Sequence, residues 1–267
     1  MSWHLKSLGY VSGVFLLFGL SIRLDAGSYT ANFSLNTASN DFHQYVQLGS
    51  LGASNSPDEN ALITWDTLRG SLNLMGKYNN RVSVVLVKGG DLDNGVWNGN
   101  TSASIKFFYE MGDGKIDDVG VGLALRQSDA GNLIGGYNTF PLYRLDFFTN
   151  TLQIVAQDQY DPLQWGPIIA SASNIPTPSK EETVICTLNF SVQDVDGDVL
   201  LNGSILEGEK TLGSVKATIA NLGSTHLTAT NQVFKSGYIG IYGGDCGTMG
   251  SNRGVRITGF TVTPTAP

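Results

Sequence analysis

Short segments with alternating apolar residues recur along the chain, and each is ended by glycine, asparagine or aspartate. Apolar residues at every second position are typical of strands that turn one face to a core and the other to solvent. Helical periodicity is almost absent. The segments predicted as strands are 71–76, 81–90, 102–112, 119–127, 142–149, 151–158, 183–194, 198–208, 216–223, 237–244 and 255–263.

The connections between these segments are short and rich in Asn, Asp and Gly, which suits antiparallel hairpins. The clearest long loop is 172–182, which holds two prolines. It could be a linker, but the segments on either side look alike and each half alone would make a poor core. We therefore predict one all-β domain, a two-sheet antiparallel β-sandwich.

Charge limits the classes of partner. Charged residues make up 15% of the 267 residues, the formal net charge is −7, and the sequence has no run of Lys or Arg. A nucleic-acid-binding protein needs a basic patch or stripe. The composition therefore excludes nucleic acid as a partner and is typical of extracellular all-β proteins.

Residues 1–26 have the layout of a secretory signal peptide, with Lys6 before an apolar run from Val11 to Ile22 and small residues around Ala26. The run is shorter than the ~20 residues that a membrane-spanning helix needs. An uncleaved anchor or a buried first helix is the alternative. We predict cleavage after residue 26 and a mature domain of residues 27–267 without a membrane span, secreted or held at the cell surface.

The chain has two cysteines, Cys186 in an alternating segment and Cys246 in a glycine-rich loop. In an oxidising compartment a disulfide between them is expected. The alternative is two separate thiols, one buried and one in a loop. Sequence separation does not decide between the two.

Three segments carry a resemblance to a known family: "VGVGLALRQSDAGNLIGGY", "YRLDFFTNTLQIV" and "GYIGIYGG…GVRITGFTV". They resemble the central hairpin, the following strand pair and the closing strands of a laminin-G-like jelly roll of secreted bacterial proteins. This fold belongs to the concanavalin A-like lectin/glucanase superfamily. The resemblance covers most of 31–263 and implies the jelly-roll form of the sandwich, a fold that hosts lectins, hydrolases, lyases and adhesion modules.

The stretch "YEMGDGKIDDVG" (109–120) looks like part of a calcium loop, but it lacks three of the ligands that an EF-hand requires. We interpret it as a connection between two strands. Jelly-roll rims often bind calcium with scattered carboxylates, so Asp113, Asp117 and Asp118 stay candidate calcium ligands.

A second acidic stretch, "QDVDGDVLLNG" (193–203), predicts a hairpin because Asp-Gly stands between two alternating runs. Alternation places Asp194, Asp196 and Asp198 toward one side of an extended chain, where their carboxylates repel unless something binds or solvates them.

No catalytic motif is recognisable. The resemblance suggests two tests, the Glu-x-Asp-x-Glu strand of laminarinase-type glycosidases and the Arg/Glu/Arg strand of alginate lyases, and the chain has neither. We therefore favour a non-catalytic protein. Two alternatives stay open: a carbohydrate-active enzyme that uses acids such as Asp146 or Glu110, and a structural surface protein whose edge strands mediate assembly.

The candidate ligand-binding residues are aromatic rings in polar loops, since sugars stack on rings while neighbouring polar groups hold their hydroxyls. They are Trp97, Trp165, Tyr160 and Tyr137. Alternatively, each tryptophan covers an end of the sandwich as a hydrophobic lid. Arg126 and Arg144 interrupt apolar strands and either face a concave sheet or reach the surface. We predict recognition of a glycan or a cell-surface polysaccharide.

Overall fold

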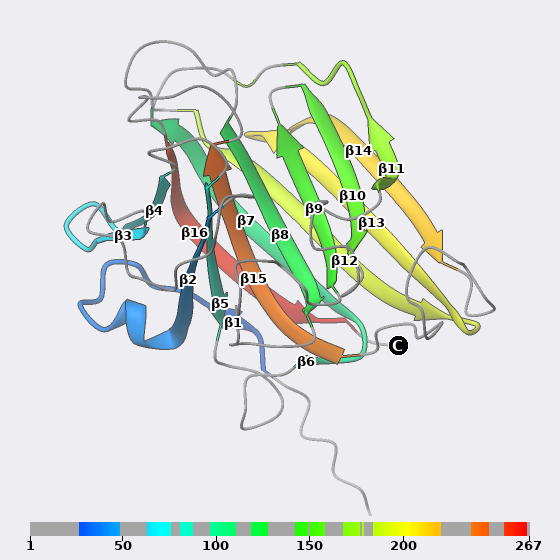
Figure 1. Cartoon of the computed structure of the whole chain (residues 1–267), viewed down its shortest axis with the longest axis horizontal. Coiled ribbons are helices and arrows are strands. Elements are labelled where there is room, and N and C mark those ends of the chain that lie inside the picture. Colours follow the sequence, from blue (N-terminus) through cyan, green and yellow to red (C-terminus); the bar gives the residue numbers. More distant parts are fainter. Residues whose placement is uncertain are drawn as a thin grey trace, which may run out of the picture.

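The computed structural model describes residues 27–48, 63–75, 81–87, 97–110, 119–127, 142–148, 150–157, 168–176, 178, 184–219, 236–245 and 254–265. In this part of the chain sixteen strands form two sheets, and the only helix is the 3₁₀-helix η1 (Ala38–Asp41) (Figure 1). None of the helices in the described ranges is long and apolar enough to cross a membrane.

Sheet A holds both the first and the last described strand. Its order is β14 (Lys210–Ile219), β13 (Asp198–Glu207), β12 (Cys186–Val195), β7 (Thr101–Glu110), β16 (Gly254–Pro264), β4 (Ser71–Met75) and β3 (Ile63–Asp66). β1 (Tyr29–Thr30) pairs with β16, so that Tyr29 lies opposite Val262. The beginning and the end of the described chain are thus joined in one strand pair.

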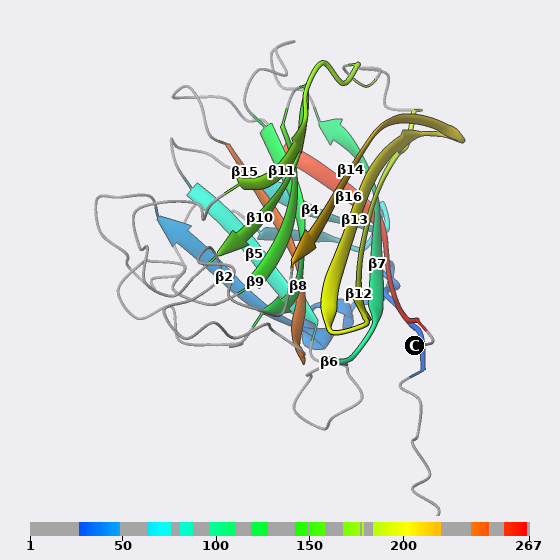
Figure 2. The ribbon, with the colours of Figure 1, turned by 90° about the vertical axis from the view of Figure 1, so that its right-hand side faces the viewer.

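Sheet B is built from the remaining strands. Its order is β11 (Ile168–Ala172), β10 (Thr151–Gln157), β9 (Leu142–Phe148), β8 (Val119–Gln127), β15 (Ser236–Asp245), β5 (Arg81–Val87) and β2 (Phe42–Leu48), and β6 (Trp97–Asn98) pairs with β15. All of these pairings are antiparallel. Seen edge-on, the sheets are two layers face to face (Figure 2), which confirms the predicted two-sheet antiparallel sandwich.

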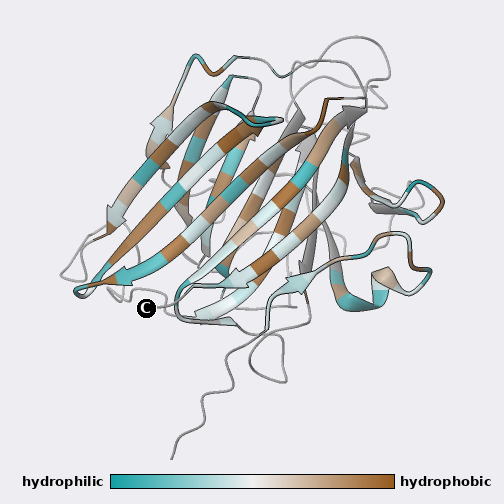
Figure 3. Ribbon diagram, turned by 180° about the vertical axis from the view of Figure 1, so that it is seen from behind, coloured by the Kyte–Doolittle hydropathy of each residue, from teal (hydrophilic) through white to brown (hydrophobic). Residues whose placement is uncertain are grey.

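Alternation along the strands builds the core, and Figure 3 shows hydrophobic and hydrophilic bands alternating along sheet A. In β12, Leu188, Phe190 and Val192 are buried while the residues between them are half-buried on the other face. In β9, Leu145 and Phe147 are buried in the same hydrophobic cluster. Each such side chain contributes about 1.5–3 kcal/mol when it leaves water, so the two inner faces hold the sheets together.

Two glycines let each sheet insert a leucine into the other. A side chain at Gly203 of sheet A would overlap Leu145 of sheet B. A Cβ at Gly243 of sheet B would lie 2.5 Å from Leu74 of sheet A. Because real Cβ atoms essentially never come that close to another atom, a larger residue at either position would force the facing leucine to move. Each leucine thus packs directly against the backbone of the opposite sheet.

The hairpin predicted around Asp196 and Gly197 is confirmed. These two residues form the turn between β12 and β13, with φ of 51° and 91°. Positive φ at both central residues is the two-residue turn whose twist matches the flanking strands. The ten-residue ladder that follows pairs Cys186 with Glu207 at its far end.

Every predicted segment corresponds to a strand, but the structure has more strands than the prediction. β14 begins at Lys210, six residues before the predicted start at 216, and β1, β2, β3, β6 and β11 were not among the predicted segments. The predicted segment begins too late because Gly213 interrupts the apolar pattern of β14. In the structure Gly213 leaves space for the buried side chain of Ile175. β11 lacked a signal because it alternates poorly, with Ile168 57% exposed. Residues 1–26, predicted to be a signal peptide, lie outside the described residues.

Candidate functional site

The face of sheet B that is turned away from sheet A carries a group of polar side chains. In β8, β9 and β15 the core residues alternate with Ala124, Arg144, Asp146 and Tyr242 on this outer face. The outer face of an antiparallel sheet is commonly solvated. Here Ala124 is 0%, Arg144 1% and Tyr242 3% exposed. These charged and aromatic groups therefore lie in a buried environment.

Arg144 and Asp146 form an ion pair within β9. The Nε of Arg144 donates to both carboxylate oxygens of Asp146, at 2.8 Å each. The two side chains meet because residues two apart on a strand share a face. Opposite them, Gly122 makes room, since a Cβ there would lie 2.6 Å from Oδ1 of Asp146. Burial raises the pKa of Asp146, and the guanidinium of Arg144 opposes this shift.

Tyr242 extends the polar group toward the end of β8. Its ring lies beneath the guanidinium of Arg144, 5.6 Å from Cζ to the ring centroid. Its hydroxyl donates to Oε1 of Gln127 at 2.6 Å. Burial raises the pKa of Tyr242, so the phenol stays protonated and remains a donor.

A bulge in β8 decides which side chain reaches Tyr242. Ala124 lies opposite Gly240 and Gln127 opposite Tyr238, so β8 has one more residue than β15 over this stretch. The extra residue accompanies the φ of 53° at Arg126. A bulge of this kind breaks the alternation of faces. Gln127 thereby comes to the outer face, and Arg126 is released from it.

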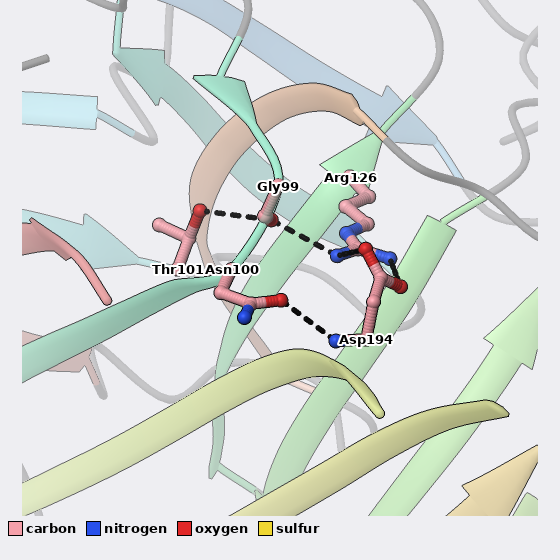
Figure 4. Close-up of polar contacts among 5 residues, drawn as sticks. All are labelled: Gly99, Asn100, Thr101, Arg126 and Asp194. Carbon is pink, nitrogen blue, oxygen red and sulfur yellow. Dashed lines mark hydrogen bonds and ion pairs between the residues drawn. The ribbon is translucent and has the colours of Figure 1, made fainter. Parts of the chain in front are cut away.

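Arg126 instead ties sheet B to sheet A. Its guanidinium bonds both carboxylate oxygens of Asp194, at 3.0 Å each, and donates to the carbonyl of Gly99 at 2.9 Å. The backbone N–H of Asp194 donates to the side chain of Asn100 at 2.7 Å. Figure 4 shows this clasp, with Arg126 from β8 pointing at Asp194 beside the β12–β13 hairpin. Bidentate pairs of this type are among the stronger polar contacts in proteins.

We call Gln127, Arg144, Asp146 and Tyr242 the sheet B cluster, and Arg126, Asp194, Asn100 and Gly99 the Arg126 clasp. They adjoin because Gln127 follows Arg126 in β8. The cluster stiffens the middle of sheet B, and the clasp anchors the end of β8 to the opposite sheet. Together they hold that end of the sandwich in one geometry.

The two predicted arginines are thus brought to one region, but neither reaches the surface. Arg126 is 2% and Arg144 1% exposed, and each is engaged by a carboxylate. Both guanidinium groups are therefore bonded inside the protein, which neither alternative from the sequence described. The bulge turns Arg126 inward, and the neighbouring Asp146 holds Arg144.

Trp97 is placed in the core. It is 3% exposed and belongs to the hydrophobic cluster, next to Gly237 of β15. A ring covered on both faces cannot stack on a sugar, so the prediction of Trp97 as a ligand-binding residue is corrected to the lid that the sequence left as the alternative. Its Nε1–H has no hydrogen-bond partner among the described residues.

The other predicted aromatic residues, Tyr137, Tyr160 and Trp165, lie outside the described residues. The strand ends that flank their segments are described. Gln157 pairs with Leu142, and Ile168 pairs with Val155, so β9, β10 and β11 enter and leave sheet B at one end. The segments 128–141 and 158–167 therefore begin and end at neighbouring positions, close to the end of β8.

Cys186 is a buried thiol that forms no disulfide within the described residues. Its side chain alternates into the core, where burial and the nearby Glu207 raise its pKa to about 12. The disulfide with Cys246 stays a prediction. Cys246 itself lies outside the described residues.

The acids named for an enzyme do not form a catalytic pair. Asp146 is not unpaired, because both of its oxygens accept from Arg144. Glu110 ends β7 in the other sheet. Asp146 and Glu110 therefore lie on different sheets and not together on one strand, as the two carboxylates of a glycosidase of the laminarinase type would.

The candidate calcium ligands Asp113, Asp117 and Asp118 also lie outside the described residues, between β7 and β8. In the described part of the chain no three His, Cys, Asp or Glu side chains gather as a metal site would require. Asp146 does not fit a cation either, since a guanidinium already occupies its carboxylate. Calcium stays a prediction for the 111–118 segment.

Sequence reasoning missed three members of this region: Gln127, Tyr242 and the pairing of Asp194. Alternation in "GYIGIYGG" could have placed Tyr242 on the face opposite the isoleucines. The expected repulsion near Asp194 was the signal for a cationic partner. The bulge that brings Gln127 to the outer face has no sequence signature here.

Comparison with solved structures shows the same fold in lectins. The chain is similar to the carbohydrate recognition domain of Emp46p in a potassium-bound form (TM-score 0.53, 12% identity, 90% of this chain and 98% of that chain). It is similar to lectin UEA-II complexed with galactose (TM-score 0.56, 9% identity, 91% and 100%). A third is the exoplasmic/lumenal domain of VIP36, bound to Ca²⁺ and Man3GlcNAc (TM-score 0.54, 11% identity, 91% and 90%).

These similarities show that the fold is a concanavalin A-like jelly roll, as the sequence resemblance implied. No family model and no curated protein matches the sequence.

Proposed function

We propose that this jelly roll is a non-catalytic glycan-binding domain that works at or outside the cell surface. The binding site is proposed at the end of sheet B where β8, β9, β10 and β11 begin and end. Tyr137, Tyr160 and Trp165, in the segments that join these strands, would stack on sugar rings. The sheet B cluster and the Arg126 clasp would hold the strand ends in place.

The observation that carries this proposal is the convergence of these strand ends beside a buried, fully engaged polar cluster. Gln127 ends β8 and accepts from Tyr242, while Leu142 and Gln157 pair at the adjacent ends of β9 and β10. Binding residues are often carried on loops that a rigid scaffold positions. The similar structures of UEA-II with galactose and of VIP36 with Man3GlcNAc support sugars as the ligand class.

The test is Trp165→Ala, with binding to a panel of soluble oligosaccharides and the melting temperature measured side by side. Truncating a stacking ring at a hot spot costs on the order of 2 kcal/mol, roughly thirtyfold in affinity. We expect that loss without a change in melting temperature. Tyr137→Ala and Tyr160→Ala should act in the same direction.

Trp97→Ala is the matched control, because Trp97 is buried in the core. Its truncation should lower the free energy of unfolding by about 3–5 kcal/mol. If Trp165→Ala behaves like Trp97→Ala, with lower stability and intact affinity, the proposed site is wrong. Release of new reducing ends from the same oligosaccharides would favour the enzyme alternative.

Export is the second part of the proposal, supported by the signal-peptide layout of residues 1–26. Mass spectrometry of the protein recovered from its native host should find an N-terminus near Gly27. An intact Met1 on the secreted chain would contradict it.

A further inference from the structure

The outer face of sheet A consists mainly of small, uncharged polar side chains, unlike the outer face of an ordinary solvated sheet. Cross-strand register aligns them in two parallel rows that run perpendicular to the strands. The first row is Thr261, Ser104, Asn189, Ser204 and Ser214, and the second is Thr263, Ser102, Ser191, Asn202 and Lys216. The rows cross β16, β7, β12, β13 and β14 in that order.

The rows form the floor of a trough. A groove of 420 Å³ is lined by the residues of both rows, together with Ala103, Phe190 and Gly203 between them. On one side, the next outward row alternates short and longer side chains: Gly259, Lys106, Thr187, Leu206 and Thr211. On the other side Gln193 lies opposite Leu200. With strands about 4.8 Å apart, five strands make the trough about 19 Å long. It therefore suits an extended molecule that lies across the strands.

The chemistry of the floor selects for hydroxyl-bearing ligands. Serine and threonine hydroxyls both donate and accept hydrogen bonds, and asparagine offers two donors and an acceptor. Asn189 Nδ2 to Ser204 Oγ spans 3.4 Å, and Ser102 Oγ to the carbonyl of Thr263 spans 3.3 Å. Both contacts are longer than a good hydrogen bond, so these groups keep capacity for a ligand.

The charge of the side chains that line the trough narrows the class of ligand further. Among the described residues that line the trough the one charged side chain is Lys216, at the β14 end, and no carboxylate lines it. A protein partner is a poorer fit, because interface cores are enriched in aromatic residues and depleted in serine. The aromatic residue in the lining, Phe190, turns its side chain into the core, where it is 1% exposed.

We propose that this trough binds a neutral polysaccharide as an extended chain lying across the strands of sheet A. It is a second site, on the outer face of sheet A, and it does not depend on the glycan site proposed at the strand ends of sheet B. The polymer's regularly spaced hydroxyls would exchange hydrogen bonds with the two rows. A monosaccharide would engage too few of these groups to bind well.

The test is to place a large side chain in the trough and measure polysaccharide binding. Ser204 is the fourth of the five residues in the first row and lies between Asn189 and Ser214. Ser204→Arg places a long charged side chain in the trough. Thr218→Arg is the matched control: Thr218 is exposed on the same face of the neighbouring strand β14, outside the lining. Retention on insoluble neutral polysaccharides (cellulose, chitin, mannan and xylan) is measured for both, together with the melting temperature. The protein is made in a bacterial host so that Asn189 and Asn202, both in Asn-x-Ser sequences, stay unmodified.

We expect Ser204→Arg to weaken retention on at least one polymer about tenfold or more, with Thr218→Arg like the wild type. The double variant Asn189→Ala/Ser191→Ala, which only removes hydrogen-bonding groups, should show the same loss if Ser204→Arg proves unstable. Equal retention of Ser204→Arg and Thr218→Arg, or no retention of the wild type on any polymer, would overturn the trough.

Soluble oligosaccharides separate the two proposals. If Ser204→Arg loses the polymer but keeps the soluble sugars that Trp165→Ala loses, both sites stand. If the wild type binds soluble sugars while Ser204→Arg keeps the polymer, the sheet B site stands and the trough fails. If no soluble sugar binds and Ser204→Arg still loses the polymer, the trough stands without the sheet B site.

Discussion

The outer faces of the two sheets are built by the same alternation but hold opposite kinds of side chain. On sheet B the outer face carries an arginine, an aspartate and a tyrosine that are 5% exposed or less and bonded to one another. On sheet A it carries serines, threonines and asparagines that are half-buried or exposed and bonded through long contacts. Polar groups that leave water need partners, whereas groups that stay wet do not.

This difference distinguishes the polar groups that make the protein rigid from those that are able to bind a ligand. The sheet B cluster has already used its hydrogen-bonding capacity inside the protein, so it can position strand ends but has little left for a ligand. The two rows on sheet A use little of their hydrogen-bonding capacity within the protein. The residues most suggestive of chemistry by type are thus structural, and the inconspicuous serines are the ones available for binding.

The largest expected effect comes from Asp146→Ala. It leaves the guanidinium of Arg144 buried without its carboxylate, and removal of one member of a buried pair typically costs about 3–5 kcal/mol. Urea denaturation should show this loss. Glu209→Ala, in the exposed turn between β13 and β14, is the control and should change the free energy of unfolding by less than about 0.5 kcal/mol. Equal stability of the two variants would remove the distinction between the faces.

Opening the clasp should have the next largest effect. Arg126→Met keeps the apolar stem but removes the bonds to Asp194 and Gly99. Asp194 is 39% exposed, so water replaces part of what is lost, and we expect about 1–3 kcal/mol. Hydrogen exchange should also quicken at the end of β8 while the middle of β12 stays protected. Uniform quickening would argue against a local clasp.

Tyr242→Phe should have a smaller effect and a distinct pH dependence. Loss of the buried hydroxyl bond to Gln127 should cost about 1–2 kcal/mol. Because the folded pKa of Tyr242 is raised above its ordinary value of 10, the folded state binds more protons than the unfolded state above pH 10. Wild-type stability should therefore fall as pH rises from 10, and more steeply than that of Tyr242→Phe. Parallel curves would show that Tyr242 does not contribute.

The smallest effect is expected on sheet A. Ser191→Ala removes a half-buried hydroxyl from the second row and should change the free energy of unfolding by less than about 0.5 kcal/mol. A loss above about 1.5 kcal/mol would mean that the row is a structural network like the one on sheet B.

Sequence patterns predicted the sandwich because alternation is a local property. It appears in each strand that buries one face in the core. They also found the β12–β13 turn, because Asp-Gly between two alternating runs is a local signal. They could not predict that Arg126 turns inward. That result depends on one extra residue in β8 relative to β15, and pairing register between strands more than 100 residues apart leaves no local pattern.

The trough on sheet A could not be predicted for the same reason, since it too depends on the pairing register. "TSASIK", "TLNFSV" and "LLNGSI" each read as an unremarkable strand with a polar face. Their serines become two continuous rows only because the ladders set Ser104 opposite Asn189 and Asn189 opposite Ser204. Periodicity predicts which face a residue takes, and pairing decides which neighbours it gains.

The pairing of β1 with β16 has a mechanical consequence. Tyr29 lies opposite Val262, near the two ends of the described chain, and Pro264 lies opposite Thr101 at the start of β7. A pulling force applied between the two ends would therefore meet the ladder at its terminus and part its hydrogen bonds one after another, instead of shearing many at once. A domain tethered through both ends would yield at low force by peeling β1 and then β16. Tethered through one end, with the load entering across the five strands of the trough, it would share that force over several ladders and hold more firmly.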